Sequence, residues 1–570
     1  MIGLSISNIK EGLCKTYVAT EPSHLIKDEN CCNHFYVSYS FYEGYPIRRF
    51  ILGDYLAIIE GCIYNKSQEE IEDTLKEYVQ SKNSSIVNSF VKESDGDFIV
   101  YLINVVDNEL IIFNDYMGRL PLYFYYHQNR LIISRKLNFI LSNISEIVIK
   151  KDSIFEYLMF EFYHGNDTLY ENISKLDFHQ MMIFNNEGLF LSNTSDDNYD
   201  IFIENSDNAT TIANEYIEST KRRSDYFKQK GILATLSGGF DSRAVFGCLN
   251  KNSVEGIDYV TYDYIQDESK VALELLSTNS NKHSFTKLAV SSNQMIDEDC
   301  LIFKTSGLIN CYTNNVCYRD LISMYNTFGR RSLFIGFGGE FFRHPYYLLA
   351  GKPGYYIRKL LSTKCESIFN GYNPSVSSII QKVLSNYKEK TTNGILKRLY
   401  YDYYKNYVVG AGEERYRLYY WTVQPLMSLR SVKLFLSLKK TSLSDFPLFC
   451  EVIKNINPAA ASVEIFGDNC NLYDKFHWWY KSFKLKVYPF LLPIQNLLFK
   501  ITKNQKFKKC EVTINDIEVL LDDKLIINSF NKEQVLKGFE QSGILVKRRM
   551  YSILKYIRVL EKYFDNIAIR

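Results

Sequence analysis

The sequence lacks the features that mark several large protein classes. Its twelve cysteines are scattered, with no CxxC pair and no Cys/His ligand spacing, which argues against a disulfide framework and against a zinc site. No stretch reaches the roughly 18 consecutive apolar residues that a membrane-spanning helix needs. The N-terminal residues MIGLSISNIKEGL contain no basic region followed by an apolar run, so no signal peptide is expected. These absences predict a cytoplasmic protein without a transmembrane segment.

An excess of charge of one sign is also lacking. The 67 Lys and Arg residues nearly balance the 65 Asp and Glu residues, and the net charge of +2 gives no electrostatic reason to expect nucleic acid as a partner. Proline and glycine are few, at 11 and 28 residues, which argues against a disordered chain. What the sequence has in abundance is aromatic residues, with 45 Tyr and 38 Phe. A chain of 570 residues is too long for one core, so two or three domains are expected.

The first 190 residues alternate between short apolar runs and turn residues. The runs at Tyr55–Ile59, Phe98–Val105, Leu110–Phe113 and Leu131–Ser134 are separated by Gly, Asn and Asp, and Glu69–Tyr78 has a helical pattern. This region therefore predicts layered antiparallel sheets with some helix. Residues 192–209 are polar and acidic, and they are the expected linker.

After the linker, strands alternate with helices. The apolar run Gly231–Leu236 precedes a helical pattern, Ile257–Tyr262 precedes the helix-like Glu268–Leu276, and another short run follows at Leu333–Gly336. Such alternation implies crossover connections and a parallel sheet. From about residue 355 to the end at Arg570 we expect mostly helices.

The sharpest local signal is the string SGGFDS at residues 237–242, between an apolar strand and a helix. Gly238 and Gly239 allow a sharp turn that brings backbone amides close to a ligand, and the following helix points its free N–H groups at the same place. Ser237 and Ser242 add hydroxyl donors. The carboxylate of Asp241 would repel phosphate unless a Mg²⁺ ion stood between them. The loop therefore predicts a site for ATP and Mg²⁺.

Because no lysine follows the glycines, this loop differs from the GxxxxGK[ST] loop of phosphoryl-transfer enzymes. SGGFDS resembles the pyrophosphate-binding loop of the asparagine synthetase family, which also contains β-lactam-forming and lasso-peptide-cyclising members. The N-terminal segments GCIYN (61–65), DGDF (95–98) and DYMGRLPLY (115–123) resemble segments of that family's glutaminase domain, and GFGGE (336–340) resembles its second strand-end loop. The resemblance covers roughly residues 1–345.

The resemblance implies an α/β fold in two main parts. An Ntn-hydrolase-like α/β/β/α domain is expected at 1–191, and a Rossmann-like PP-loop domain with a parallel sheet at 210–485. A helical C-terminal extension is expected at 486–570.

The same resemblance implies the site residues. Besides the SGGFDS loop, Leu236, Thr261 and Gly338 would contact the nucleotide, and Glu340 would be the second metal carboxylate opposite Asp241. For Glu268, at the start of a helix, both a functional role and a purely structural one remain open. The sequence does not decide which residue is the catalytic base, and the candidates are Arg343, His344, Tyr346, Tyr347, Lys481 and Lys484.

The sequence departs from the family in the glutaminase half. Ile2 stands where the family has a nucleophilic cysteine, and an isoleucine side chain cannot attack an amide. Glu60 replaces an asparagine that would donate a hydrogen bond to the oxyanion. The segment that would bind the carboxylate of glutamine is missing, and Tyr45–Arg49 is the sequence most similar to it. The domain is therefore expected to be a silent scaffold.

The sequence thus predicts a ligase that adenylates a carboxylate and transfers it to nitrogen, releasing AMP and pyrophosphate. The nitrogen would come from free ammonia, from a partner amidotransferase or from an amine on a small-molecule or peptide substrate. A homodimer is one option for its oligomeric state. The alternatives are a PP-loop enzyme of another class, a non-catalytic scaffold in a biosynthetic complex, and a glutamine-dependent asparagine synthetase. The loop variant SGGxDSR, with Arg243 after the second serine, resembles the loop of proteins from surface-polysaccharide or secondary-metabolite pathways. The identity of the substrate stays open.

Overall fold

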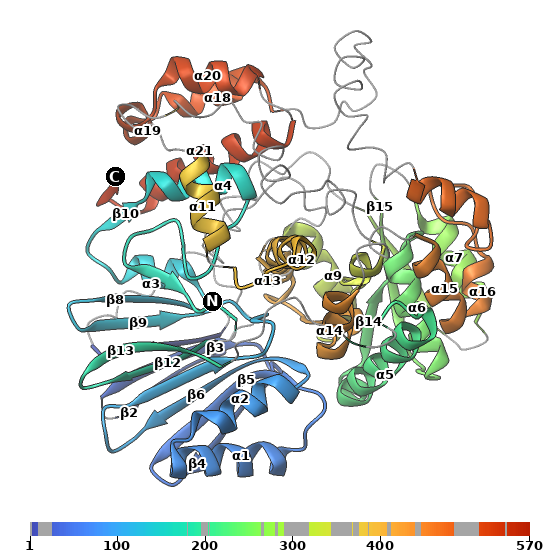
Figure 1. Ribbon diagram of the computed structural model, residues 1–570, viewed down its shortest axis with the longest axis horizontal. Coiled ribbons are helices and arrows are strands. Elements are labelled where there is room, and N and C mark those ends of the chain that lie inside the picture. The colour runs from blue at the N-terminus through green and yellow to red at the C-terminus, as the bar shows by residue number, and fades with distance from the viewer. Residues whose placement is uncertain are drawn as a thin grey trace.

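Two antiparallel sheets, one parallel sheet and a set of C-terminal helices make up the fold (Figure 1). The computed structural model describes residues 3–9, 26–32, 34–178, 180–194, 203, 206–263, 267–279, 283–289, 318–343, 368, 376–385, 387–406, 412–438, 446–483, 512–541 and 544–570. In Figure 1 the antiparallel sheets lie at one side of the molecule and the parallel sheet at the other.

The N-terminal part contains two six-stranded sheets. The first has the order β11 (Ile173–Lys175), β8 (Tyr123–His127), β9 (Arg130–Ser134), β1 (Gly3–Ser7), β3 (Phe35–Phe41) and β2 (Ile26–Cys32). The second has the order β13 (Gly188–Asn193), β12 (Gln180–Asn185), β7 (Leu110–Asn114), β6 (Gly96–Asn104), β5 (Tyr55–Ile63) and β4 (Ile47–Leu52). Aromatic side chains join the two sheets, with the Phe35 and Phe184 rings in edge-to-face contact at 6.0 Å.

Helices cover the outer faces of these sheets. α1 (Gln68–Ser81) and α2 (Ser84–Glu93) lie beside the second sheet, and α3 (Leu137–Ser142) and α4 (Lys151–Phe160) beside the first (Figure 1). α1 begins with a capping box between Ser67 and Glu70, and it buries Ile71, Leu75 and Tyr78 at helical spacing. The result is the α/β/β/α layering expected from the sequence.

A five-stranded parallel sheet forms the second part. Its order is β16 (Ser284–Ala289), β15 (Asp258–Asp263), β14 (Ile232–Thr235), β17 (Ser332–Phe334) and β18 (Trp421–Val423). The helices of this part are α5 (Ala209–Phe227), α6 (Phe240–Lys251), α7 (Ser269–Ser277), α9 (Tyr318–Phe328), α14 (Leu429–Ser437), α15 (Phe446–Ile456) and α16 (Pro458–Ser462), with short η2 (Lys228–Lys230), η3 (Gly339–Phe342) and η6 (Pro425–Met427). α12 (Thr392–Tyr403) and α13 (Gly412–Tyr416) lie between the two parts, whereas α11 (Val376–Ser385) lies beside α4 (Figure 1).

The C-terminal helices lie on the side of the N-terminal part of the chain (Figure 1). α18 (Ile514–Leu521), α19 (Lys524–Ser529) and α20 (Lys532–Gln541) rest on the long α21 (Ile544–Tyr563), which contacts α4. The last strand, β19 (Ile567–Ile569), then pairs in parallel with β10 (Ile147–Ile149). The sequence did not predict this return of the chain.

The fold class predicted from the sequence is confirmed. Tyr55–Ile59 and Leu110–Phe113 fall within β5 and β7, Phe98–Val105 overlaps β6, and Glu69–Tyr78 falls within α1. The expectation of a mostly helical chain after residue 355 was incomplete, because β18 adds an edge strand to the parallel sheet and β19 adds one at the end. The domain boundaries stay a prediction; β13 ends at Asn193 and α5 begins at Ala209.

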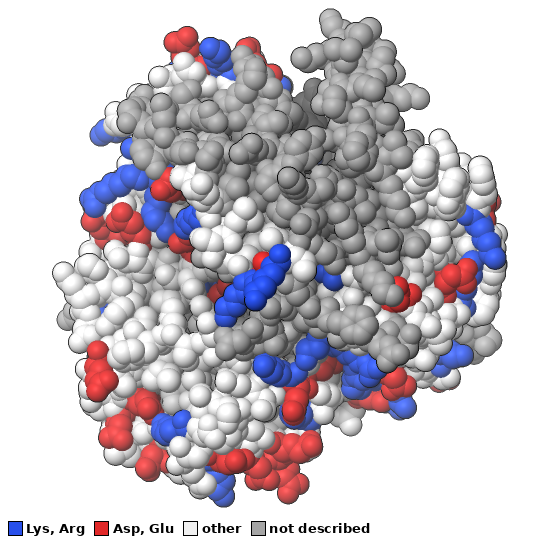
Figure 2. Space-filling model, viewed as in Figure 1, with Lys and Arg blue, Asp and Glu red and all other residues white. Residues whose placement is uncertain are grey.

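Among the described residues, no helix is both long and apolar enough to cross a membrane. On the face shown in Figure 2, acidic and basic side chains of the described residues are interspersed.

Candidate functional site

The SGGFDS loop lies at the carboxyl end of β14, in the middle of the parallel sheet. α6 begins at Phe240 with Gly239 as its N-cap, and no side chain caps this helix end. The hydroxyls of Ser237 and Ser242 lie 2.8 Å apart, and Ser242 Oγ also accepts a hydrogen bond from the Ser237 amide at 3.0 Å. The two serines therefore close the loop and hold the first turn of the helix in place. The uncapped helix end leaves backbone donors for an anion.

Gly238 is needed because another backbone segment passes close to it. A Cβ atom at this position would lie 2.4 Å from Cβ of Phe466. The Phe466 amide in turn donates to the Gly238 carbonyl at 3.1 Å. The loop is thus pinned from the side by the segment that follows α16. Arg243 also attaches the start of α6 to this segment, because its buried guanidinium donates to the carbonyls of Ala460 and Glu464 at 3.0 and 2.6 Å.

A carboxylate from outside the loop lies on its backbone. The Gly238 amide donates to Glu268 Oε2 at 2.8 Å. Glu268 is the N-cap residue of α7, but its side chain caps no amide of its own helix. Helix capping therefore does not account for the position of this side chain, which binds the SGGFDS loop instead. The Gly238 amide is thus directed outward, where it donates to a carboxylate oxygen.

The second loop, which follows β17, is packed directly against Asp241. A Cβ atom on Gly339 would lie 2.0 Å from Asp241 Oδ1, and one on Gly336 would lie 2.7 Å from the Asp241 carbonyl carbon. Gly338 has a φ of +104°, a conformation that favours glycine. These glycines let the two loops approach one another. Glu340 follows at the start of η3 and is partly buried.

Asp241 and Glu340 act on one another and on one cation. The Arg343 guanidinium forms an ion pair with Asp241, and its Nε donates to Asp241 Oδ1 at 3.3 Å. Burial raises the pKa of Asp241 to about 7; Arg343 opposes this rise, and the Glu340 charge adds to it. Both carboxylates also raise the pKa of Arg343, against the effect of its burial. Within the described residues only Asp241 forms an ion pair with Arg343, and Glu340 acts on that pair through its charge at longer range.

This pair of carboxylates suits Mg²⁺ when phosphate oxygens are present. Mg²⁺ in nucleotide sites is commonly held by one or two carboxylates together with phosphates and water. Within the described ranges, no group of three or more His, Cys, Asp or Glu side chains forms a metal site by itself. A metal at Asp241 and Glu340 would accordingly need ligand oxygens to complete its shell.

Tyr404 connects the second loop to the helices between the two parts of the chain. Its hydroxyl accepts from the Gly338 amide at 2.6 Å and donates to Glu340 Oε2 at 3.0 Å. Burial and the Glu340 charge raise the pKa of Tyr404 well above its usual value, so the phenol stays protonated. Sequence reasoning missed this residue because the chain contains 45 tyrosines and Tyr404 lies among several of them at the end of a helical segment.

The other predicted residues lie around the same sheet edge. Leu236 and Thr261 are buried, and the Leu236 amide donates to the Val260 carbonyl at 2.8 Å, beside the end of β15. Of the possible bases, Arg343 pairs with Asp241, and Lys481 is bound by Asp468 at 2.7 Å. His344, Tyr346, Tyr347 and Lys484 lie outside the described residues.

In the N-terminal domain, an ion pair lies beside the first residue of β1. Glu60 Oε1 accepts from Arg135 and from the Tyr45 hydroxyl, both at 2.6 Å. A Cβ on Gly3 would lie 2.7 Å from Cγ of Arg135 and 2.9 Å from Glu60 Oε1. Glu60 is thus a hydrogen-bond acceptor at the start of β1. Ile2 lies outside the described residues.

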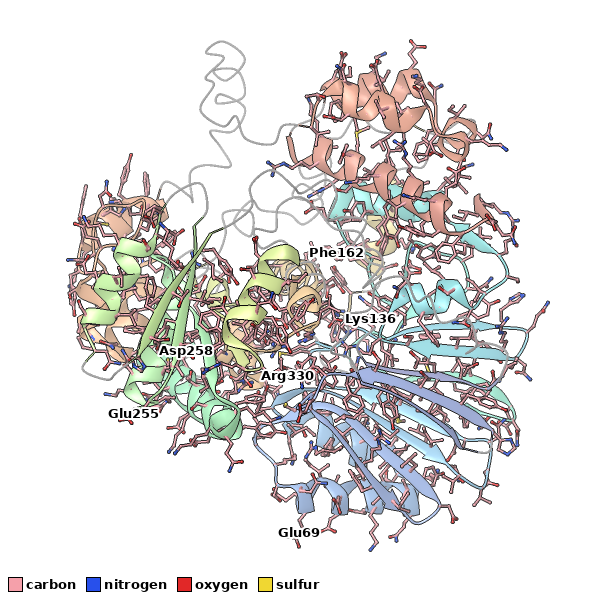
Figure 3. All side chains as sticks on the ribbon, turned by 180° about the vertical axis from the view of Figure 1, so that it is seen from behind. Glu69, Lys136, Phe162, Glu255, Asp258 and Arg330 are labelled. Atoms are coloured by element: carbon pink, nitrogen blue, oxygen red, sulfur yellow. The ribbon has the colours of Figure 1, made fainter. Side chains whose placement is uncertain are left out.

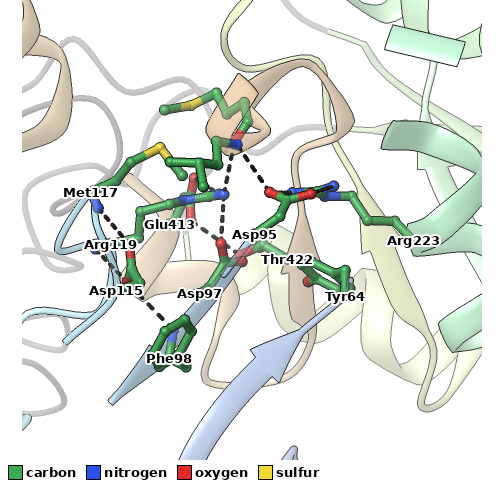
Figure 4. A network of polar contacts seen from close by, with 12 residues as sticks. Tyr64, Asp95, Asp97, Phe98, Asp115, Met117, Arg119, Arg223, Glu413 and Thr422 are labelled. Atoms are coloured by element: carbon green, nitrogen blue, oxygen red, sulfur yellow. Dashed lines mark hydrogen bonds and ion pairs between the residues drawn. The ribbon is translucent and has the colours of Figure 1, made fainter. Parts of the chain in front are cut away.

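The acidic residues of the N-terminal segments hold the two parts of the chain together (Figure 4). Asp97 pairs with Arg119 at 2.5 Å, and Arg119 lies 3.7 Å from Glu413 of α13. Asp95 pairs with Arg223 of α5 at 2.9 Å. It also accepts from the Leu429 amide at 3.0 Å.

The buried polar contacts between the two parts of the chain continue at Lys136, labelled in Figure 3. Lys136 and Arg135 both bind the buried carboxylate of Glu414, and Arg135 does so at 2.5 Å. Side chains that resemble a glutaminase signature therefore form a buried interface between the two parts.

Comparison with known proteins supports an amidotransferase-like N-terminal part. Residues 52–194 match the family described as a glutamine amidotransferase domain. The chain matches no curated protein.

Two solved structures show only a distant likeness. The first is glutamine phosphoribosylpyrophosphate amidotransferase from B. subtilis, complexed with ADP and GMP. It is 8% identical, with a TM-score of 0.21, over 57% of this chain and 65% of that one. The second, the allosteric regulatory enzyme of purine biosynthesis, is 9% identical, with a TM-score of 0.21, over 63% of this chain and 80% of that one. These TM-scores are too low to define a shared overall fold.

Proposed function

We propose that this protein is an ATP-dependent ligase that adenylates a substrate carboxylate and transfers the acyl group to nitrogen. The observation that carries the proposal is the meeting of two strand-end loops of a parallel sheet. One loop leaves the first amides of α6 uncapped and holds the Glu268 carboxylate on its Gly238 amide, and the other places Glu340 near the Asp241–Arg343 ion pair. Ligands of open α/β sheets bind at this edge.

The residues of the chain have separate tasks in this proposal. When the Glu268 carboxylate leaves the Gly238 amide, the loop amides and the hydroxyls of Ser237 and Ser242 hold the phosphates of ATP. Mg²⁺ bound to Asp241 and Glu340 would neutralise the charge of the polyphosphate. Tyr404 keeps Glu340 in position through its hydrogen bond. The nucleotide base would lie beside Leu236 and Thr261, with Gly338 near the phosphates.

The proposed reaction has two steps. A substrate carboxylate oxygen attacks the α-phosphorus of ATP, and pyrophosphate leaves. An amine or ammonia then attacks the acyl carbon, and amide and AMP are released, with the nucleophile's proton passing to a base among the residues near the second loop.

The glutaminase half is proposed to be silent. Support comes from Glu60, whose carboxylate is held by Arg135 and would repel an oxyanion. Nitrogen would then come from free ammonia, a partner amidotransferase or the substrate itself. Purified protein incubated with glutamine is expected to release no glutamate, while added ammonium or a substrate amine supports AMP formation.

The substitution Asp241→Asn tests the ligase assignment. It removes a negative charge and preserves the shape of the side chain, so exchange of pyrophosphate into ATP in the presence of candidate carboxylates should fall at least about 100-fold. Asp225→Asn, at an exposed position of α5, is the matched control. Undiminished exchange in the Asp241→Asn protein, with a native circular dichroism spectrum, overturns the assignment.

A non-catalytic scaffold is the second candidate, and one observation favours it. The chain's own groups already satisfy the site, because Glu268 lies on the Gly238 amide and Arg343 pairs with Asp241. Calorimetric titration with ATP and Mg²⁺ distinguishes the two functions. A scaffold would show no binding in the wild type but gain it when Glu268 or Arg343 is replaced by alanine.

A further inference from the structure

A cavity of about 100 Å³ lies where three parts of the chain meet. The N-terminal sheets and the segment after α4 form most of its wall, with Asn406 beyond the end of α12 and Tyr556 of α21 closing it. Phe162, labelled in Figure 3, lies in this wall. The cavity is separate from the two strand-end loops of the candidate site, none of whose residues lines it.

The lining is aromatic with few charges. Five tyrosines contribute their rings: Tyr123, Tyr157, Tyr163, Tyr170 and Tyr556. Such rings give apolar contact along their faces and hydroxyls at their edges.

Three of the four charged side chains in the wall have partners of opposite charge. Lys405 is bound by Asp177 at 2.9 Å, and Glu161 is bound by Arg549 at 3.1 Å. Asp167 is bound by Lys150 at 3.4 Å and also by Lys382. These charges are therefore compensated within the chain.

Lys175 is the exception. Its ammonium group donates a hydrogen bond to the neutral Oδ1 atom of Asn406. Within the described part of the chain, no carboxylate oxygen lies within 4.0 Å of its Nζ atom, the largest distance for an ion pair. Burial and the neighbouring charge of Lys405 lower the pKa of Lys175 to about 8, against the more distant charges of Asp177, Asp402 and Glu156. Within the described residues, this ammonium therefore has no counter-ion in direct contact.

We propose that this cavity binds a small carboxylate, whose charged end meets Lys175 and whose hydrocarbon body lies among the tyrosine rings. The size of the cavity sets the class of ligand: an apolar cavity of about 150 Å³ accommodates benzene. A space of about 100 Å³ fits a short aliphatic carboxylate such as propionate. The carboxylate supplies the missing counter-charge and accepts hydrogen bonds from the ammonium group.

The place of the cavity links it to the second strand-end loop. Lys405 and Asn406 line the cavity and directly follow Tyr404, whose hydroxyl contacts Gly338 and Glu340. The binding inference itself does not depend on the proposed ligase function.

Saturation-transfer NMR with propionate tests the inference on the full-length protein. Propionate should give a saturable signal in the wild type, and n-propanol, a neutral molecule of similar size, should bind at least about tenfold more weakly. The substitution Lys175→Met removes the charge but keeps the length of the side chain, and it should weaken propionate binding by at least about tenfold. Lys76→Met, at an exposed position of α1, is the matched control and should bind as the wild type does.

Three results would overturn the proposal. Equal binding of propionate and n-propanol would mean that the cavity selects apolar molecules without regard to charge, which overturns the proposal. Propionate binding that survives Lys175→Met, or no propionate signal up to about 50 mM, overturns it as well. Because Lys175→Met removes a partly buried charge that has no carboxylate in direct contact within the described residues, the variant is expected to fold, and its circular dichroism spectrum checks this.

Discussion

At the scale of single residues, buried ionic groups carry much of the organisation of this protein. Asp95 is the clearest case, because it forms an ion pair with Arg223 of α5 and accepts a hydrogen bond from the Leu429 amide at the start of α14. Burial alone would raise the pKa of Asp95, but the Arg223 guanidinium lowers it to about 2. The carboxylate is therefore ionised throughout the range in which the protein is expected to work, and it joins the N-terminal sheets to the parallel-sheet part.

This arrangement predicts a pH-dependent contribution to stability. A carboxyl whose pKa falls on folding stabilises the native state above its unfolded pKa, near 4, and that contribution disappears as the pH falls towards 2. Asp95→Asn should lower the free energy of unfolding by about 3–5 kcal/mol at pH 7, because it leaves Arg223 buried without its partner. The difference between wild type and variant, measured by urea unfolding, should shrink as the pH is lowered from about 4.

Asp107→Asn is a suitable control, because Asp107 is exposed in the turn between β6 and β7. This control should change the free energy of unfolding by less than about 0.5 kcal/mol. An equally small effect of Asp95→Asn at pH 7 would show that the Asp95–Arg223 pair does not join the two parts.

At the scale of elements, the contact between the two strand-end loops depends on glycine. A Cβ atom on Gly339 would overlap Asp241 Oδ1, and its next neighbour, the Phe449 ring, lies at 3.1 Å. Gly339→Ala should therefore cost about 1–3 kcal/mol, the range typical of overpacking. In an Asp241→Ala background the same substitution should cost less than about 1 kcal/mol, since the overlapping carboxylate is gone.

A double-mutant cycle in urea measures this coupling. The Gly339→Ala effect should shrink by at least about 1 kcal/mol when Asp241 is alanine. Additive effects would mean that the two loops do not touch in solution, and the proposed metal position between Asp241 and Glu340 would then be wrong.

The elements that sequence reasoning predicted are those with a strong local signal. Gly231–Leu236 and the SGGFDS string fall on β14 and on the turn into α6, because a buried apolar run followed by two glycines and a helical pattern needs no distant partner to be recognised. β18 escaped prediction, since three residues show no periodicity and their place is set by pairing with β17. The pairing of Glu268 with Gly238 and of Arg343 with Asp241 is likewise set by tertiary contacts between segments 30 and 102 residues apart.

At the scale of the whole molecule, the C-terminal region is part of the N-terminal body. The Arg549 guanidinium donates to the Leu158 and Met159 carbonyls at the end of α4, at 3.1 and 2.7 Å. The hydroxyls of Tyr170 and Tyr556 lie 2.6 Å apart. The chain thus passes from the antiparallel sheets through the parallel sheet and returns to where it began (Figure 1). Such closure couples the stability of the first and last segments.

Strand β19 allows a direct test of this coupling. The Arg570 amide donates to the Ile149 carbonyl at 2.9 Å, and the Lys151 amide donates back to the Arg570 carbonyl at 2.9 Å. Arg570→Pro removes the first of these donors and disturbs the pairing. Arg570→Ala removes only the exposed ion pair with Glu146, which is worth at most about 1 kcal/mol. Hydrogen exchange at the Ile147 and Lys151 amides, both of which donate to this segment, should therefore accelerate at least about tenfold in the proline variant relative to the alanine variant. Equal exchange rates in the two variants would mean that the C-terminal strand is not paired with β10, and the closure of the chain onto its N-terminal sheets would then rest on α21 alone.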